Sequence, residues 1–299
     1  MTFITPNQQS DHSAAEGMDR SYSRPQTVMN VAWTAIAFTL LGIALLPLLL
    51  VLSYVTVKGI GRFNLELFTG QIPAALQEGG GIGSAIVGTL ITVAISTLIS
   101  VPFGILAAIY LSEFSQGQVA EWIRFATNVL SGVPSIIVGI FAYGVLVVTT
   151  GKFSALAGGF ALAILMLPLI VRSTDEALQL VPQDVRWASS GVGASKYQTV
   201  LQVVLPAALP TILTGTTLAI ARAAGETAPL IFTTLFSQFW SRGLFDPTPT
   251  LAVLIYNFAT VPFQNQQDIA WAASLVLVLF VLMTSILAHW ATRKSLYNR

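Results

Sequence analysis

The chain has 299 residues, of which 54% are hydrophobic and only 9% are charged, and its formal net charge is +1. Since soluble domains carry about 25% charged residues, this composition excludes a soluble globular protein and predicts an integral membrane protein. Cysteine is absent from the sequence, which excludes disulfides, thiolate metal sites and a cysteine nucleophile.

Residues 1–28 are polar and of mixed charge, and we expect them to form a mobile cytoplasmic tail. The apolar run that follows has no small-residue cleavage site behind it, so it resembles an anchoring span rather than a secretory signal. We therefore divide the chain into the tail, a first transmembrane helix with a periplasmic loop over residues 29–83, and a core over residues 84–299.

Six apolar runs are long enough to cross a bilayer, since a hydrocarbon core of about 30 Å needs roughly 20 apolar residues per helix. Backbone groups in lipid must bond within their own segment, so the runs predict helices and an all-α fold. The predicted spans are Val31–Val57, Ser84–Leu111, Trp122–Thr149, Phe153–Val171, Ala207–Phe236 and Ile269–Trp290. The distribution of lysine and arginine between the loops predicts that both termini are cytoplasmic.

Prolines interrupt the second, third and fourth predicted spans, at Pro102, Pro134 and Pro168. Proline is common in membrane helices, where it produces simple kinks. The alternative is that the kink over Gly132–Ser135 lets the helices flex between inward-open and outward-open states.

Between the fourth and fifth spans the chain is polar over residues 182–206. Pro182 and Asp184 suit the first turn of a short helix from about Gln183 to Ser190. A break at Gly191 and Gly193 would separate it from a second helix that starts at about Lys196. The segment is either an ordinary cytoplasmic linker or a surface that receives force from a partner.

Arg222 and Glu226 lie four residues apart near the middle of the fifth predicted span, which places both charges on one helix face. A charge at the bilayer centre costs about 2.5–3.5 kcal/mol on insertion scales, so both side chains should face protein or a water-filled cavity. Arg172 and Glu176 form a second pair at the end of the fourth span. They are either a snorkelling anchor or a second contact for an anion.

The sequence contains no P-loop, so the chain is expected to bind no ATP itself. Its two histidines, His12 and His289, lie far apart in the sequence, which makes a histidine metal or catalytic cluster very improbable. An intramembrane enzyme would need such a cluster, or a nucleophile with its base, within the spans. We therefore expect a transport protein with no catalytic residue, no metal site and no cofactor of its own.

The polar segment resembles the EAA loop of ABC-transporter importer permeases. Ala188, Gly193 and the stretch Val203–Pro206 stand at matching positions, whereas Trp187 replaces the glutamate and Ser189 the second alanine. The resemblance implies a MetI-like permease core whose loop forms a cytoplasmic coupling helix on an ATP-binding partner. The implied coupling residues are Asp184, Trp187, Ala188, Ser189, Gly193, Ala194, Ser195 and Lys196.

Two further stretches, Gly132–Gly139 and Leu218–Leu230, resemble the permeases of phosphate importers. This resemblance implies a phosphate pathway that includes Arg222, Glu226 and Arg172. Implied partners are a homologous permease subunit, a dimer of ATP-binding subunits that carries ATP and Mg, and a periplasmic phosphate-binding protein; no nucleic acid is expected. Alternatives that remain open are a permease for sulfate or molybdate, a passive channel, and a sensor scaffold.

Overall fold

The computed structural model describes residues 25–115 and 117–297. Most of the predicted tail, including His12, lies outside these residues, and so does the side chain of His289. The chain forms two units, residues 1–54 and 55–299, which we describe separately. No strand occurs in the described residues, in agreement with the predicted all-α fold.

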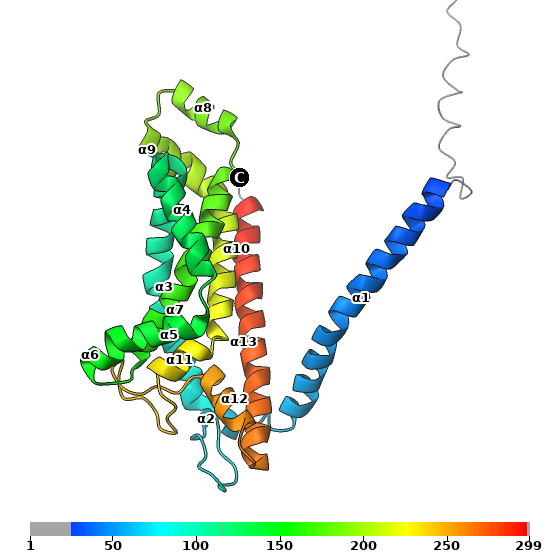
Figure 1. The fold of residues 1–299 in the computed structure, drawn as a ribbon, viewed down its shortest axis with the longest axis vertical. Coiled ribbons are helices and arrows are strands. Elements are labelled where there is room, and N and C mark those ends of the chain that lie inside the picture. The colour runs from blue at the N-terminus through cyan, green and yellow to red at the C-terminus, as the bar shows by residue number, and fades with distance from the viewer. Residues whose placement is uncertain (1–24, 116, 298–299) are drawn as a thin grey trace, which may run out of the picture. The chain divides into compact units, whose positions relative to one another are not determined.

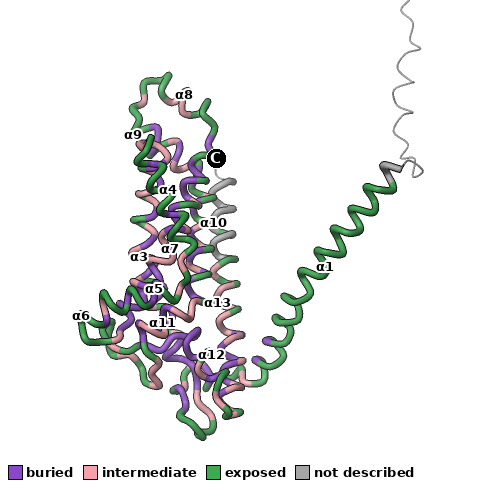
Figure 2. Tube along the Cα trace, in the orientation of Figure 1, coloured by how far each residue is buried: buried purple, intermediate pink, exposed green. Residues whose placement is uncertain are grey.

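The first unit consists of most of helix α1, Pro25–Ile60, which has 36 residues and would be about 54 Å long. Its residues 28–54 are all exposed (Figure 2). A helix that is apolar on every side is typical of a lipid-embedded span. Because α1 begins at Pro25, the last residues of the predicted tail are already helical.

The second unit contains the remaining helices and three π-helical turns (Figure 1). The helices up to the polar loop are α2 Leu65–Thr69, α3 Gly83–Ile109, α4 Gln118–Ser131, α5 Ser135–Ala142, α6 Val148–Thr150, α7 Ala155–Gln179 and α8 Gln183–Gly191. Those that follow are α9 Lys196–Thr199, α10 Leu205–Ala224, α11 Ala228–Thr233, α12 Leu251–Ala259 and α13 Gln264–Tyr297. The π-helical turns are η2 Tyr110–Phe114, η3 Tyr143–Val147 and η4 Val200–Val204.

Helix α7 occupies the middle of the second unit and packs against α3 and α10. It is the most buried of the candidate spans, with 61% of its apolar window covered by protein. Helices α8 and α9 lie at one end of this unit, and α2 and α12 lie at the other (Figure 1). In the described residues, five helices are long and apolar enough to cross a membrane, or six spans if the bent pair α4 and α5 counts as one.

The third predicted span, Trp122–Thr149, is not a single straight helix. It is broken between α4 and α5, which bend by 99° relative to one another. Pro134 has no N–H to continue the helical bonding and disfavours helical geometry in the residue before it. Gly132 closes α4 as its C-cap, so three residues separate the two helices. The predicted kink is therefore a sharp turn of the chain.

The prediction was wrong about both ends of the fifth span, Ala207–Phe236. The helix starts at Lys196, runs through η4 into α10 and stops at Ala224. The wide π turn ends two residues before Pro206, whose missing N–H breaks the regular bonding pattern. At the other end Gly225 caps the helix, and Pro229 lies in the first turn of α11. Arg222 consequently lies in the last turn of α10 rather than near the middle of a span.

A close backbone contact fixes α5 against α11. A Cβ atom at Gly139 would lie 2.6 Å from Cα of Pro229, so no side chain fits there without a shift of backbone. Both residues belong to the stretches that resemble phosphate-importer permeases. Through this contact the helix after the α4–α5 break is held beside the segment that follows Arg222.

Candidate functional site

A pocket of about 350 Å³ lies where the α4–α5 break meets α7 and the end of α10. Arg172 and Arg222 both line it, although they are 50 positions apart in the sequence. The other lining residues are Leu130, Ser131, Val133, Pro134, Ser135, Leu165, Pro168 and Leu169. The structure thus brings together two of the predicted pathway residues, Arg172 and Arg222, and most of the Gly132–Ser135 stretch.

Helical spacing explains the contribution of α7. Leu165, Pro168, Leu169 and Arg172 follow one another at intervals of three, one and three residues, which places them on one helix face. Arg222 reaches the same pocket because α10 ends just after it. Its side chain is 66% exposed in this chain, so the guanidinium is accessible to a ligand.

Each of these arginines has a carboxylate partner four residues later. Arg222 Nε lies 3.5 Å from Glu226 Oε1, and Arg172 Nε lies 2.9 Å from Glu176 Oε1. The predicted pair of Arg222 and Glu226 forms, but the helix does not continue through it, because Gly225 is the C-cap. Glu226 does not line the pocket, and its side chain is only 17% exposed. Exposed ion pairs contribute about 0–1 kcal/mol, so Arg172 and Arg222 can exchange partners easily.

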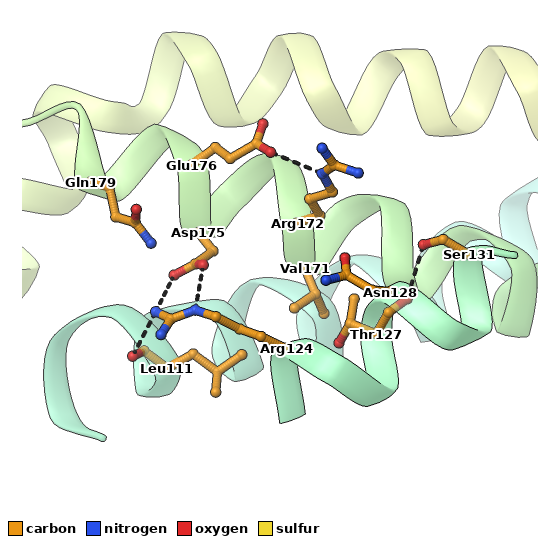
Figure 3. Close-up of a pocket in the computed structure, with 10 residues that line it drawn as sticks. All are labelled: Leu111, Arg124, Thr127, Asn128, Ser131, Val171, Arg172, Asp175, Glu176 and Gln179. Atoms are coloured by element: carbon orange, nitrogen blue, oxygen red, sulfur yellow. Dashed lines mark hydrogen bonds and ion pairs between the residues drawn. The ribbon is translucent and has the colours of Figure 1, made fainter. Parts of the chain in front are cut away.

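A second pocket of about 700 Å³ adjoins the first, since Ser131 and Arg172 line both. It lies between α4 and α7 (Figure 3). Arg124 of α4 reaches across to Asp175 of α7, with Nε 2.9 Å from Oδ2 and Nη2 3.1 Å from Oδ1. Its Nη2 also donates to the carbonyl of Leu111 at 3.3 Å. This paired arrangement is the strong, directional form of an arginine–carboxylate contact.

Sequence reasoning missed Arg124 and Asp175 as site residues. Asp175 falls inside a span only because α7 continues to Gln179, eight residues beyond the predicted end at Val171, and a charge within a span is costly unless it is paired. The sequence could not indicate which arginine pairs with it.

The predicted coupling residues form a separate surface on α8, the turn after it, and the start of α9. Pro182 precedes α8, Asp184 lies in its first turn, and Gly193 has a φ of +90° in the turn, which favours glycine. Ser195 caps α9 by accepting a hydrogen bond from the N–H of Gln198. The predicted helix boundaries at Gln183 and Lys196 are thus confirmed.

Most of this surface is exposed to solvent in the isolated chain. The side chains of Trp187, Val192 and Tyr197 are 68%, 86% and 67% exposed. Asp184, Ala188, Gly193, Ser195 and Lys196 are exposed as well, whereas Ser189 and Ala194 are half-buried. Ser189 Oγ lies 2.9 Å from Thr199 Oγ1, which ties α8 to α9. Exposed large apolar residues beside polar ones are typical of a protein-binding surface. No residue of this surface lines either pocket.

Among the residues that the structure describes, no group of three or more histidine, aspartate or glutamate side chains is arranged to hold a metal ion. The 350 Å³ pocket instead offers two guanidinium groups and two serine hydroxyls, whereas the 700 Å³ pocket also holds the paired carboxylates of Asp175 and Glu176. Guanidinium and hydroxyl groups bind anions by hydrogen bonding and charge, without a metal bridge.

Comparison with known proteins places this arrangement in a family. Residues 100–296 match the family described as "Binding-protein-dependent transport system inner membrane component". The chain is 42% identical over 243 residues to the phosphate transport system permease protein PstA of Yersinia pestis, covering 81% of this chain and 82% of that protein. It is 35% identical over 269 residues to PstA of Mycobacterium leprae, covering 88% of each.

Solved structures share the fold. A bacterial alginate ABC transporter aligns with a TM-score of 0.62 at 14% identity over 92% of this chain and 98% of that one. The MetNI methionine ABC transporter in an inward-facing conformation aligns with a TM-score of 0.57 at 20% identity, over 72% of this chain and 94% of that one. The helical core is therefore that of an importer-type ABC permease, as the sequence predicted.

Proposed function

Since this chain belongs to the PstA family of phosphate transport system permeases, we propose that it forms half of the pathway through which an ATP-driven importer carries inorganic phosphate. It is a multi-pass membrane protein, and as a permease it is a transport subunit. The observation that carries the proposal is the shared pocket of Arg172 and Arg222, at the break between α4 and α5.

Two guanidinium groups that face one pocket suit a tetrahedral oxyanion. Each presents paired N–H donors whose spacing matches two phosphate oxygens, which an ammonium group cannot reproduce. Glu226 and Glu176 neutralise the arginines when the pocket holds no anion. They also compete with phosphate for the same donors, so the anion binds weakly enough to leave, as transport requires.

The walls of this pocket come from segments that can move against each other. One wall is the α4–α5 break, another is α7, and the third is the end of α10. A change in the packing of these helices alters the separation of Arg172 and Arg222. Alternating access would then be a two-state repacking that opens the pocket first to one side of the membrane and then to the other.

The energy source is a partner. We propose that the α8–α9 surface, with Asp184, Trp187, Ala188, Ser189 and the Gly193–Lys196 turn, docks on a PstB-like dimer that binds ATP and Mg. The exposed Trp187 supports this, because a large indole in solvent is a typical anchor for a protein partner. The chain itself would hydrolyse no ATP. This surface would be cytoplasmic, as would both termini.

Two further partners complete the proposed importer. A homologous PstC-like permease would supply the other half of the pathway, and a PstS-like periplasmic protein would deliver phosphate. The loops over residues 59–83 and 237–268 lie at the end of the unit opposite α8 (Figure 1) and are the proposed docking region for the periplasmic protein.

Reconstitution of the purified assembly in proteoliposomes tests the proposal. We expect uptake of labelled phosphate that requires ATP and the binding protein, and that excess sulfate or molybdate does not inhibit. Inhibition by those anions would favour another oxyanion as substrate. Uptake that persists without ATP would instead indicate a passive channel and contradict the proposal.

A further inference from the structure

A buried ion pair joins the loop helix α8 to the π-helical turn η2. Arg186 Nη2 lies 2.7 Å from Glu113 Oε1, and the two side chains are only 14% and 8% exposed. Neither residue lines the pockets described above. The two residues are 73 positions apart in the sequence, so the contact depends on how the helices pack.

The same guanidinium also holds the end of α7. Arg186 Nη2 donates to the carbonyl of Leu178 at 2.8 Å, and Nη1 donates to the carbonyl of Val181. One side chain therefore links α8, η2 and the C-terminus of α7. A buried ion pair is a weak source of stability compared with apolar packing, because both charges are desolvated. Its main effect here is to fix the orientation of three segments.

From η2 the polar contacts continue to the 700 Å³ pocket. Leu111, two residues before Glu113, accepts a hydrogen bond from Arg124, which also binds Asp175 (Figure 3). Asp175 lies three residues after Arg172 on α7, close to one helical turn. A continuous path of hydrogen bonds and helix backbone thus runs from α8 to the wall that carries Arg172.

Aromatic contacts hold α9 on the same turn. The rings of Phe114 and Tyr197 have centroids 5.0 Å apart, and Lys196 Nζ lies 5.2 Å from the Phe114 centroid. Both helices of the coupling surface are therefore attached to η2, which is continuous with α3. If α8 is displaced, η2 must move with it unless these contacts break.

On the basis of the proposed function, we propose that Glu113 and Arg186 are positioning residues that make α8 and η2 move as one body. Movement of α8 by the ATP-binding partner would shift η2 and, through Leu111 and Arg124, move α4 relative to α7. The pocket of Arg172 and Arg222 lies at that junction. Without the Glu113–Arg186 pair, α8 would still bind the partner, but only the contacts of α9 with Phe114 would remain to carry its movement toward the pocket.

The test measures ATP hydrolysis and phosphate uptake in the same proteoliposomes, with the full importer carrying Glu113→Gln. We expect uptake per ATP hydrolysed to fall about tenfold or more, since a charged hydrogen bond is lost, with hydrolysis within about twofold of the parent. Glu113→Asp keeps the charge and should restore part of the ratio. Lys152→Gln, which removes one charge at an exposed loop position outside the cluster, is the matched control and should change neither rate.

A covalent link provides a second measurement that does not depend on the stability of Glu113→Gln. The chain has no cysteine, so Glu113→Cys with Arg186→Cys introduces the only two thiols in this subunit. A short bifunctional thiol reagent should restore uptake per ATP in the double variant but not in either single variant. Restoration would show that α8 and η2 need to remain joined throughout the cycle.

Two results would overturn the inference. One is an unchanged ratio of uptake to hydrolysis in Glu113→Gln, whether or not both rates fall together. The other is a cross-linked double variant that hydrolyses ATP without transport. Failure of the proposed function would be visible separately, because the parent assembly itself would then take up no phosphate.

Discussion

Replacement of Arg222 by glutamine separates a role in the pathway from a role in holding the fold. The guanidinium is 66% exposed and lies 3.5 Å from Glu226 Oε1, beyond the usual range for a strong charged hydrogen bond. Loss of such an exposed pair costs about 0–1 kcal/mol of stability. We therefore expect Arg222→Gln to assemble normally, with little change in its thermal unfolding temperature.

The effect on transport is expected to be much larger. A hydrogen bond to a charged group contributes about 1.5–3 kcal/mol, and every 1.4 kcal/mol corresponds to about tenfold. Phosphate uptake at low substrate should fall about 10-fold to 150-fold in Arg222→Gln. Arg222→Lys keeps the charge but lacks the paired donors, so its uptake should lie between that of the parent and that of the glutamine variant.

The assay is initial-rate uptake of labelled phosphate in proteoliposomes, normalised to the amount of assembled importer. Lys152→Gln is the matched control, because it removes one positive charge at an exposed loop position away from the pockets. Full uptake by Arg222→Gln would refute the pathway role of Arg222. Loss of assembly would instead show that the pair with Glu226 holds the fold.

Three further substitutions test other parts of the structure. Trp187→Ala should abolish co-purification of the ATP-binding subunit without unfolding the chain, because the indole is 68% exposed. Gly139→Ala should lower stability by about 1–3 kcal/mol in a thermal assay, since its Cβ would lie 2.6 Å from Cα of Pro229. Gly193→Ala has open space around it but a φ of +90°, so backbone strain alone should cost about 1–2 kcal/mol and weaken partner binding.

Each of these has a clear contrary outcome. Retained binding by Trp187→Ala would exclude the indole as an anchor for the partner. An unchanged unfolding temperature for Gly139→Ala would show that α5 and α11 can separate at no cost. Normal partner binding by Gly193→Ala, despite its strain, would mean that the shape of the turn does not matter for docking.

The polar loop was predictable because its signals are local. Pro182 and Asp184 mark the start of α8, Gly193 marks the turn, and the helix after it begins at Lys196. Proline and glycine act through their own backbone geometry, so they determine helix boundaries wherever they occur. The pairing of Arg222 with Glu226 was also predictable from spacing, although it forms across a helix end.

The two misplaced spans show where local signals are insufficient. Pro134 indicated a kink, but the 99° bend depends on the packing of α5 against α11. In the same way, the sequence remains apolar through Pro229, although the helix stops at Ala224. Hydropathy reports how far a segment prefers lipid or protein over water, and it does not report the direction in which the segment runs.

The sequence by itself determined that this is a helical membrane protein, where its polar loop lies, and that Arg222 and Glu226 can pair. Only the tertiary structure decided which charges meet. Arg172 shares a pocket with Arg222, Arg124 binds Asp175, and Arg186 binds Glu113. The two ion pairs join residues 51 and 73 positions apart, and all three arrangements depend on how the helices of the second unit pack. Spacing along one helix fixes the face on which a side chain lies, whereas its partner depends on lateral packing between helices.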